Sequence, residues 1–140
     1  MDIRTFEIGD TEPVVRLWRE CGLVAPQNDP YRDIARKGAV QPELFLVGCR
    51  EGRPIATVMA GYDGHRGWIN YLAVSPAHRR RGLGRRMVAE AERRLRRLGC
   101  PKINLQVRRS NLEVIAFYRR LGFTEDDVVS MGRRLEADPA

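Results

Sequence analysis

The stretch Arg79-Arg80-Arg81-Gly82-Leu83-Gly84 decides the fold, because it lies between a segment patterned as a strand and a segment patterned as a helix. Pro76 ends the strand, and apolar residues at helical spacing predict a helix over about residues 82–98, with Gly99 just beyond its C-terminus. The N-terminus of a helix presents unpaired N–H groups and a partial positive charge, which favour acidic residues. Here arginines crowd it, and glycines remove side chains that would keep an anion from the backbone. The stretch therefore predicts a seat for a phosphate group; the alternative is a solvated basic helix after a glycine-rich turn.

The net charge of +7 is concentrated around the same stretch. Residues 78–109 hold twelve basic residues and two acidic ones, an excess of +10, whereas the rest of the chain holds 13 basic and 16 acidic residues, an excess of −3. Glu90 and Glu92 are expected to pair with Arg94 and Arg96 at i+4 spacing, which accounts for later arginines of the helix without a ligand. A high bulk charge alone would favour a nucleic-acid partner, but a charge confined to one segment favours one bound anion.

Length and composition favour one folded domain over residues 1–140. A hydrophobic fraction of 43% and a charged fraction of 31% exclude extended disorder. No apolar leader is visible after Met1, and no apolar run approaches the ~20 residues of a membrane span. Cys21, Cys49 and Cys100 form no CxxC pair, which favours core packing over catalysis and a cytoplasmic, reducing location. No metal site is expected.

Turn residues and apolar periodicity divide the chain into strands and helices. Ser110 and Glu113 form a capping box that predicts the start of a helix ending at residues 121–122. A strand pair over residues 123–135 is expected to close the sheet. The order is β-α-α-β-β-β-α-β-α-β, an α/β (α+β) mixture around one sheet. The other expected strands are residues 3–7, 44–49, 54–62, 68–74 and 103–107, and the other expected helices are residues 13–21, 31–39 and 82–98.

The chain resembles the GNAT superfamily, the Gcn5-related N-acetyltransferases, at these elements. Arg79-x-x-Gly82-x-Gly84 fits its motif A, [QR]-x-x-G-x-[GA], and Tyr71-Leu72-Ala73-Val74-Ser75-Pro76 is similar to the strand that precedes that motif. Residues 111–123 resemble motif B, and residues 61–67 are similar to the bacterial YpeA-type subgroup. The resemblance implies a single N-acetyltransferase domain, with a central mixed, mostly antiparallel sheet flanked by about four helices.

The resemblance also implies acetyl-coenzyme A (acetyl-CoA) as co-substrate, without a metal. Its pyrophosphate would lie on the backbone amides of residues 81–86, and Asn111 would contact the pantetheine arm. The strand before the motif would offer backbone hydrogen bonds to the same arm, where the fourth and fifth strands splay apart. The cofactor-binding residues expected on this basis are Leu72, Ala73, Val74, Arg79, Arg80, Arg81, Gly82, Leu83, Gly84, Arg85, Arg86, Asn111 and Tyr118.

Tyr118 is the residue that the resemblance implies as proton donor to the departing thiolate. Asn111, Ile115 and Tyr118 share one helix face, and seven residues at a rise of ~1.5 Å separate the first from the last by roughly 10 Å. This length would let one lie along the arm and the other near the sulfur. The ordinary pKa of a tyrosine is about 10, above that of a thiol, so the phenol can act as an acid. The alternative role is a core aromatic residue, and the two roles are compatible.

The general base and the acceptor site are less defined. Many family members carry a Glu on the fourth strand, but residues 68–71 hold no carboxylate, which leaves water, a neutral amine or a residue elsewhere. Asp63 and His65 are the nearest ionisable candidates, unless Asp63 only makes a hairpin turn. Asn28 and Asp29 lie in the loop between the first two helices, where Asp29 either attracts a cationic amine or caps the next helix.

The predicted function is transfer of an acetyl group from acetyl-CoA to a primary amine of a small molecule or a protein, by direct attack in a ternary complex. The enzyme would position both substrates, polarise the thioester carbonyl near the Val74 amide and protonate the thiolate. One alternative is a basic nucleic-acid-binding module. The other is a non-catalytic acyl-CoA-binding regulatory domain, since the strand carboxylate is missing. An amine-bearing acceptor is the expected partner, a membrane is not, nucleic acid is disfavoured, and the family implies a homodimer.

Overall fold

Five strands form one sheet in the order β1-β2-β3-β4-β5 in the computed structural model, which describes residues 1–138. Neighbouring strands are antiparallel except β4 and β5, which are parallel. The strands are β1 (Asp2–Thr5), β2 (Phe45–Arg50), β3 (Arg53–Tyr62), β4 (Gly67–Val74) and β5 (Ile103–Leu105). The helices are α1 (Thr11–Glu20), α2 (Pro30–Gly38), α3 (Leu83–Arg97) and α4 (Leu112–Arg120). This mixed, mostly antiparallel sheet with four helices confirms the predicted fold class.

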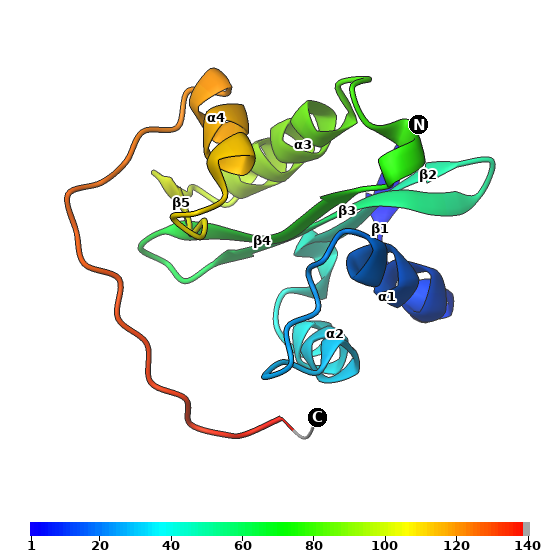
Figure 1. Cartoon of the computed structure of the whole chain (residues 1–140), viewed down its shortest axis with the longest axis horizontal. Helices are drawn as coiled ribbons and strands as arrows, with labels where there is room; N and C mark the ends of the chain where they lie inside the picture. The colour runs from blue at the N-terminus through cyan, green and yellow to red at the C-terminus, as the bar shows by residue number, and fades with distance from the viewer. Residues whose placement is uncertain (139–140) are drawn as a thin grey trace.

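The four helices cover both faces of the sheet, with α3 and α4 on one face and α1 and α2 on the other (Figure 1). Side chains of a strand alternate between the faces, so each face has its own core. Leu46 lies in the core that includes Met87 of α3, whereas its neighbour Phe45 lies in the core that includes Trp18 of α1. No helix within residues 1–138 has both the length and the apolar character that a membrane span requires.

The strands β4 and β5 part soon after they begin, which prepares an open edge in the middle of the sheet. β5 pairs with β4 at Gly67, Trp68 and Ile69. Beyond Ile69, the β5-facing edge of β4 has no partner strand within the described part of the chain. A bulge at Tyr71, whose φ is +50°, shifts the register of β4 against β3 at the same level. The open edge therefore begins at the bulge and ends at the loop that leads into α3.

The sequence predicts the side-chain pairs of α3 correctly and the first residue of α4 less well. The predicted pairs on α3 are confirmed, with nitrogen–oxygen distances of 3.0 Å for Glu90–Arg94 and 3.8 Å for Glu92–Arg96. The capping box at Ser110 is wrong by one residue, because the N-cap of α4 is Asn111, whose side chain accepts a hydrogen bond from the Val114 N–H at 3.3 Å. Asn and Ser are equally good N-caps, so local preference does not separate them.

The predicted strand pair over residues 123–135 is wrong: no strand forms within residues 121–138. Figure 1 shows this C-terminal segment sweeping away from α4 as an extended chain that ends on the side of α2. Side chains hold it beside β5, since Asp126 binds Lys102 Nζ at 2.9 Å and Ser130 binds Gln106. These side chains span the space between the two backbones, which are thus not in the ~4.8 Å register of a sheet.

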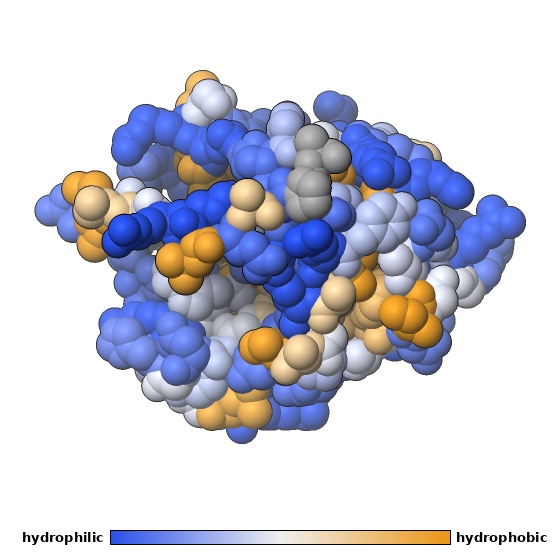
Figure 2. Space-filling model, turned by 90° about the horizontal axis from the view of Figure 1, so that it is seen from below, coloured by the Kyte–Doolittle hydropathy of each residue, from blue (hydrophilic) through white to orange (hydrophobic). Residues whose placement is uncertain are grey.

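The C-terminal segment exposes most of its apolar side chains. Val128, Val129, Met131 and Leu135 are between 73% and 93% exposed. Figure 2 views the molecule from the side of α2 and shows apolar residues in small groups, separated by hydrophilic ones. The end of the segment is fastened by charge instead, since Asp138 binds Arg36 at 2.6 Å.

Candidate functional site

The N-terminus of α3 offers backbone N–H groups without a partner. Gly82 is its N-cap, with φ +72°, and contributes no capping side chain. The first helical hydrogen bond runs from the Arg86 N–H to the Gly82 carbonyl, at 3.2 Å, so the N–H groups of residues 83–85 have no acceptor within residues 1–138. The first turn carries no acidic residue. This end of α3 is therefore positive in both its backbone and its side chains, and it suits an anion.

The five predicted arginines divide into two groups. Arg79 folds back, with Nε 3.3 Å from the Val74 carbonyl oxygen, and Arg86 donates to the Met1 carbonyl oxygen at 2.9 Å. Arg80, Arg81 and Arg85 are exposed, and their guanidinium groups bind no acceptor within residues 1–138. Three guanidinium groups are thus available to a phosphate beside the helix end.

The two glycines of the loop serve different purposes. Gly82 takes a left-handed backbone, which glycine adopts without strain, and a Cβ there would meet no atom within 4 Å. At Gly84 a Cβ would lie 3.2 Å from Cζ of Phe117 and 3.7 Å from Cγ2 of Val74. Gly84 therefore lets the start of α3 pack closely against α4 and the end of β4, which brings three elements together at one point.

The open edge of β4 ends at that point. The Ser75 N–H donates to the Ile55 carbonyl oxygen of β3 at 2.8 Å. Because neighbouring residues of a strand direct their backbone groups to opposite edges, Val74 directs its N–H and C=O away from β3, toward the open edge. The Val74 carbonyl accepts from Arg79 and from Cys21 Sγ at 3.4 Å, which leaves its N–H for a ligand.

Helix α4 carries the two remaining residues of the predicted site. The Oδ1 atom of Asn111 caps the helix, so its Nδ2 group stays available as a donor. Tyr118 is 7% exposed, packs edge-on against Phe117 and Phe123, and belongs to the core under α3. Burial raises the pKa of Tyr118 to about 12, so its phenol stays protonated at neutral pH.

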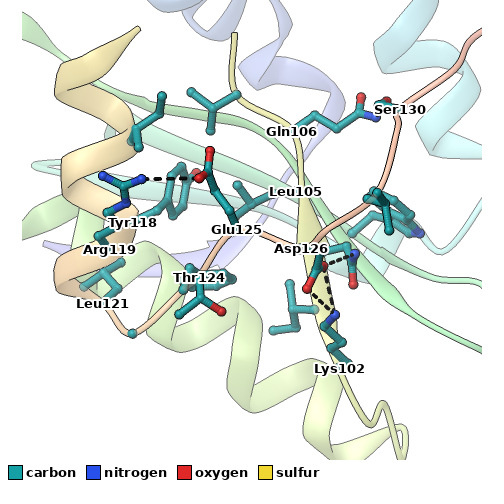
Figure 3. A pocket seen from close by; sticks show the side chains of 18 of the residues that line it. Lys102, Leu105, Gln106, Tyr118, Arg119, Leu121, Thr124, Glu125, Asp126 and Ser130 are labelled. Atoms are coloured by element: carbon teal, nitrogen blue, oxygen red, sulfur yellow. Dashed lines mark hydrogen bonds and ion pairs between the residues drawn. The ribbon is translucent and has the colours of Figure 1, made fainter. Parts of the chain in front are cut away.

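Tyr118 also lines a cavity of about 1350 Å³ between α4, β5 and the C-terminal segment. Figure 3 shows its side chain among residues from all three. The loop before α3 and the open edge of β4 lie outside this cavity. Phe117, which touches both Gly84 and Tyr118, links the cavity to the helix end.

The candidate bases lie in the hairpin between β3 and β4, at the far end of β4 from the α3 loop. Asp63 Oδ1 accepts from the backbone N–H groups of His65 and Arg66, both at 2.7 Å. These hydrogen bonds, with that from Arg66 the strongest, lower the pKa of Asp63 and weaken it as a base. His65 is exposed in the same turn. The structure does not bring either residue beside Tyr118 or the α3 loop.

The candidate acceptor residues are engaged within the chain. Asp29 caps α2 by accepting from the Tyr31 N–H at 2.9 Å, and Asn28 Oδ1 accepts from Arg134 at 2.5 Å. Sequence reasoning missed a further pair on this side: the Tyr71 hydroxyl donates to Asp33 Oδ2 of α2 at 2.5 Å. The backbone at position 71 is left-handed, a conformation that glycine or asparagine would indicate in a sequence, but the residue there is a tyrosine.

Comparison with known proteins gives consistent matches over this site. The sequence profile of the Acetyltransferase (GNAT) family matches residues 11–123. An acetyltransferase of Yersinia pestis (strain Pestoides F) is 44% identical over 138 residues, which are 99% of this chain and 98% of the relative.

Two solved structures share the fold. Their sequence identities to this chain are low, so the likeness shows the fold alone. The ribosomal-protein-S18-alanine N-acetyltransferase from Escherichia coli has a TM-score of 0.75 at 23% identity, over 89% of this chain and 78% of that one. AAC(6′)-Iy, in complex with the bisubstrate analogue CoA-S-monomethyl-acetylneamine, has a TM-score of 0.75 at 19% identity, over 95% and 97%.

Proposed function

We propose, because the chain belongs to the acetyltransferase (GNAT) family, that it transfers an acetyl group from acetyl-CoA to a primary amine by direct attack in a ternary complex. The convergence at Gly84 of the open edge of β4, the N-terminus of α3 and helix α4 supports this function. It sets unpaired N–H groups and free guanidinium groups beside an unpaired strand edge. A phosphate-bearing ligand with a long amide-containing arm matches that donor set.

The donors of this site fit acetyl-CoA. The N–H groups of residues 83–85 and the guanidinium groups of Arg80, Arg81 and Arg85 would hold its pyrophosphate. The Leu72 N–H and the Asn111 amide would hold the pantetheine arm, whose amides need such partners. Ala73 stands opposite Thr57 and directs its N–H toward β3, so its backbone faces away from this edge. The side chains of Arg79 and Arg86, engaged with Val74 and Met1, would contribute through their backbone or after rearrangement.

When bound, acetyl-CoA supplies an activated acetyl group. The Val74 N–H would donate to the acyl oxygen and stabilise the charge that develops there. Tyr118 would hold its proton on the phenol oxygen and give it to the departing sulfur. The lowered pKa of Asp63 and its place in the hairpin favour water or an already neutral amine as the means of deprotonation, over Asp63 or His65.

The acceptor is proposed at the level of an amine of a small molecule or a protein. The solved structures of this fold include one enzyme named for a ribosomal protein and one bound to an acetylneamine analogue, so the fold admits both classes. Four expectations from the sequence stay predictions: contacts of Asn28 and Asp29 with an amine, one domain over residues 1–140, a homodimer and a cytoplasmic location.

Thermal unfolding with two ligands tests the function. Acetyl-CoA is expected to raise the melting temperature, since a ligand that binds only the folded state stabilises it. Duplex DNA serves as competitor ligand. No shift with acetyl-CoA together with a salt-sensitive shift with DNA would reject the proposal in favour of nucleic-acid binding. Release of free thiol from acetyl-CoA with a panel of amines then separates an enzyme from a binding domain, because the latter shows the shift and releases none.

A further inference from the structure

Tyr71 marks the place where β4 leaves its regular register. Thr57 of β3 faces Ala73 and Met59 faces Asn70, so Val58 alone stands opposite two residues of β4. Such a bulge redirects a side chain and bends the strand. Tyr71 adopts φ +50°, a left-handed backbone that is strained for a bulky residue, so surrounding contacts must hold it there.

Three parts of Tyr71 are held at once. Its ring stacks on Trp18, with centroids 3.8 Å apart and planes 13° from parallel. Its hydroxyl donates to Asp33 Oδ2 at 2.5 Å. Its carbonyl accepts from Thr57 Oγ1 at 2.8 Å, and that hydroxyl in turn accepts from Trp18 Nε1 at 2.9 Å. Trp18 and Thr57 are fully buried, so no water competes for these hydrogen bonds.

The bulge lies in the part of β4 that forms the open edge, so the contacts of Tyr71 affect that edge. Ile69 is the last residue of β4 that pairs with β5, and Val74 ends the open edge. Tyr71 lies between them, and its side chain packs in the core under α1, whereas Leu72 and Val74 pack toward α3. Tyr71 thus sets the direction of the open edge from the face opposite to α3 and α4.

We propose that Tyr71, together with Asp33 and Thr57, is a positioning residue for acetyl-CoA: these contacts hold the bulge that aims the N–H groups of Leu72 and Val74 along the open edge, at the pantetheine arm and its acyl group. This inference rests on the proposed function. It assigns the α2 carboxylate a role in cofactor binding, although α2 lies on the face of the sheet opposite to α3 and α4.

The variants Tyr71→Asn and Tyr71→Val test the role of the backbone. Both remove the ring and its hydroxyl, but asparagine tolerates a left-handed backbone and β-branched valine does not. Titration calorimetry, at a temperature where both variants are folded by circular dichroism, measures the Kd for acetyl-CoA. Valine is expected to raise that Kd about tenfold more than asparagine. The reason is that the left-handed backbone at position 71, which we propose is the one that binds acetyl-CoA, is less populated with valine than with asparagine. Equal Kd values would overturn the proposal.

Adenosine 3′,5′-bisphosphate separates positioning from general damage. It carries phosphates of coenzyme A but no pantetheine arm, so its Kd is expected to be the same in wild type and both variants. A parallel loss of affinity for both ligands would overturn the proposal. A wild-type protein that binds neither ligand would reject the proposed function itself, and the inference with it, before any variant is compared.

Conservative variants test the hydroxyl contact without risk to the fold. Tyr71→Phe keeps the ring stack and loses the hydrogen bond to Asp33, whereas Asp33→Asn keeps an acceptor oxygen for the hydroxyl. The Kd for acetyl-CoA is expected to rise in Tyr71→Phe and to stay near wild type in Asp33→Asn. Tyr62→Phe is the matched control, because its hydroxyl binds the Gly64 carbonyl in the hairpin at 3.2 Å. A rise equal to that of the control would count against the role of Asp33.

Discussion

Tyr118 must satisfy two demands with one side chain. Its ring fills the core against Phe117 and Phe123, and its hydroxyl is proposed to deliver a proton. Burial, which raises the pKa to about 12, keeps the proton on the phenol before reaction and also makes the phenol a weaker acid. Transfer to a free thiolate would be uphill, since the ordinary pKa of a thiol is ~8.5, so the phenol is proposed to give its proton as the carbon–sulfur bond breaks and charge builds on the sulfur, and to regain one from water.

Tyr118→Phe is therefore expected to lower kcat by about a hundredfold and to leave the Kd for acetyl-CoA near wild type. The ring keeps its packing, so the melting temperature should change little. With a pKa of about 12, the wild-type phenol stays protonated as pH rises from 7 to 10, so loss of the Tyr118 proton should not lower kcat in that range. Steady-state rates of thiol release and calorimetry check this. Unchanged turnover on an identified amine would show that Tyr118 is only a core residue.

At the scale of the element, α4 depends on one side chain that is also proposed to bind the ligand. Asn111 caps the helix with its oxygen and leaves its amide group free. The sequence pattern predicts the extent of this helix well, but it predicts Ser110 as the N-cap. The difference of one residue arises because α4 is fixed by Tyr118 in the core and by Phe117 against Gly84, contacts that no local pattern contains.

The variants Asn111→Asp and Asn111→Ala separate the two roles of this residue. Aspartate caps as well as asparagine, but it lacks the donor for the pantetheine arm, so it should keep stability and weaken acetyl-CoA binding. Alanine should lose the affinity and also about 1 kcal/mol of unfolding free energy. Urea unfolding measures the stability and calorimetry the affinity. An aspartate variant that binds acetyl-CoA like wild type would show that the amide only caps α4.

At the scale of the whole molecule, the sequence predicts what is local and misses what depends on distant partners. The arginine-glycine stretch, the apolar stripe of α3 and the first five strands all appear at their predicted places. The bulge at Tyr71 depends on Trp18 and Asp33, which lie far along the chain and leave no mark on the pattern of β4. Residues 123–135 include strand-favouring Val128 and Val129, but a strand also needs a backbone partner, and this segment is tied beside β5 through side chains such as Asp126.

The same segment leads to a prediction about the division of stability. Most of its side chains are exposed, but Asp138 is not: it binds Arg36 and accepts from the Asp29 N–H at 3.0 Å. Arg134 also donates to Asn28. Ion pairs at the protein surface contribute little to stability. Removal of residues 133–140 is therefore expected to lower the melting temperature by no more than about 4 °C. The Kd for acetyl-CoA should not change, since the described residues of this end, 133–138, bind α2 and the loop before it and not α3 or the open edge of β4. Circular dichroism melts and calorimetry, with the shortened chain compared with the full chain, check this. A shortened chain that unfolds would show that the C-terminal segment is part of the core, and one that no longer binds acetyl-CoA would show that the segment is part of the site.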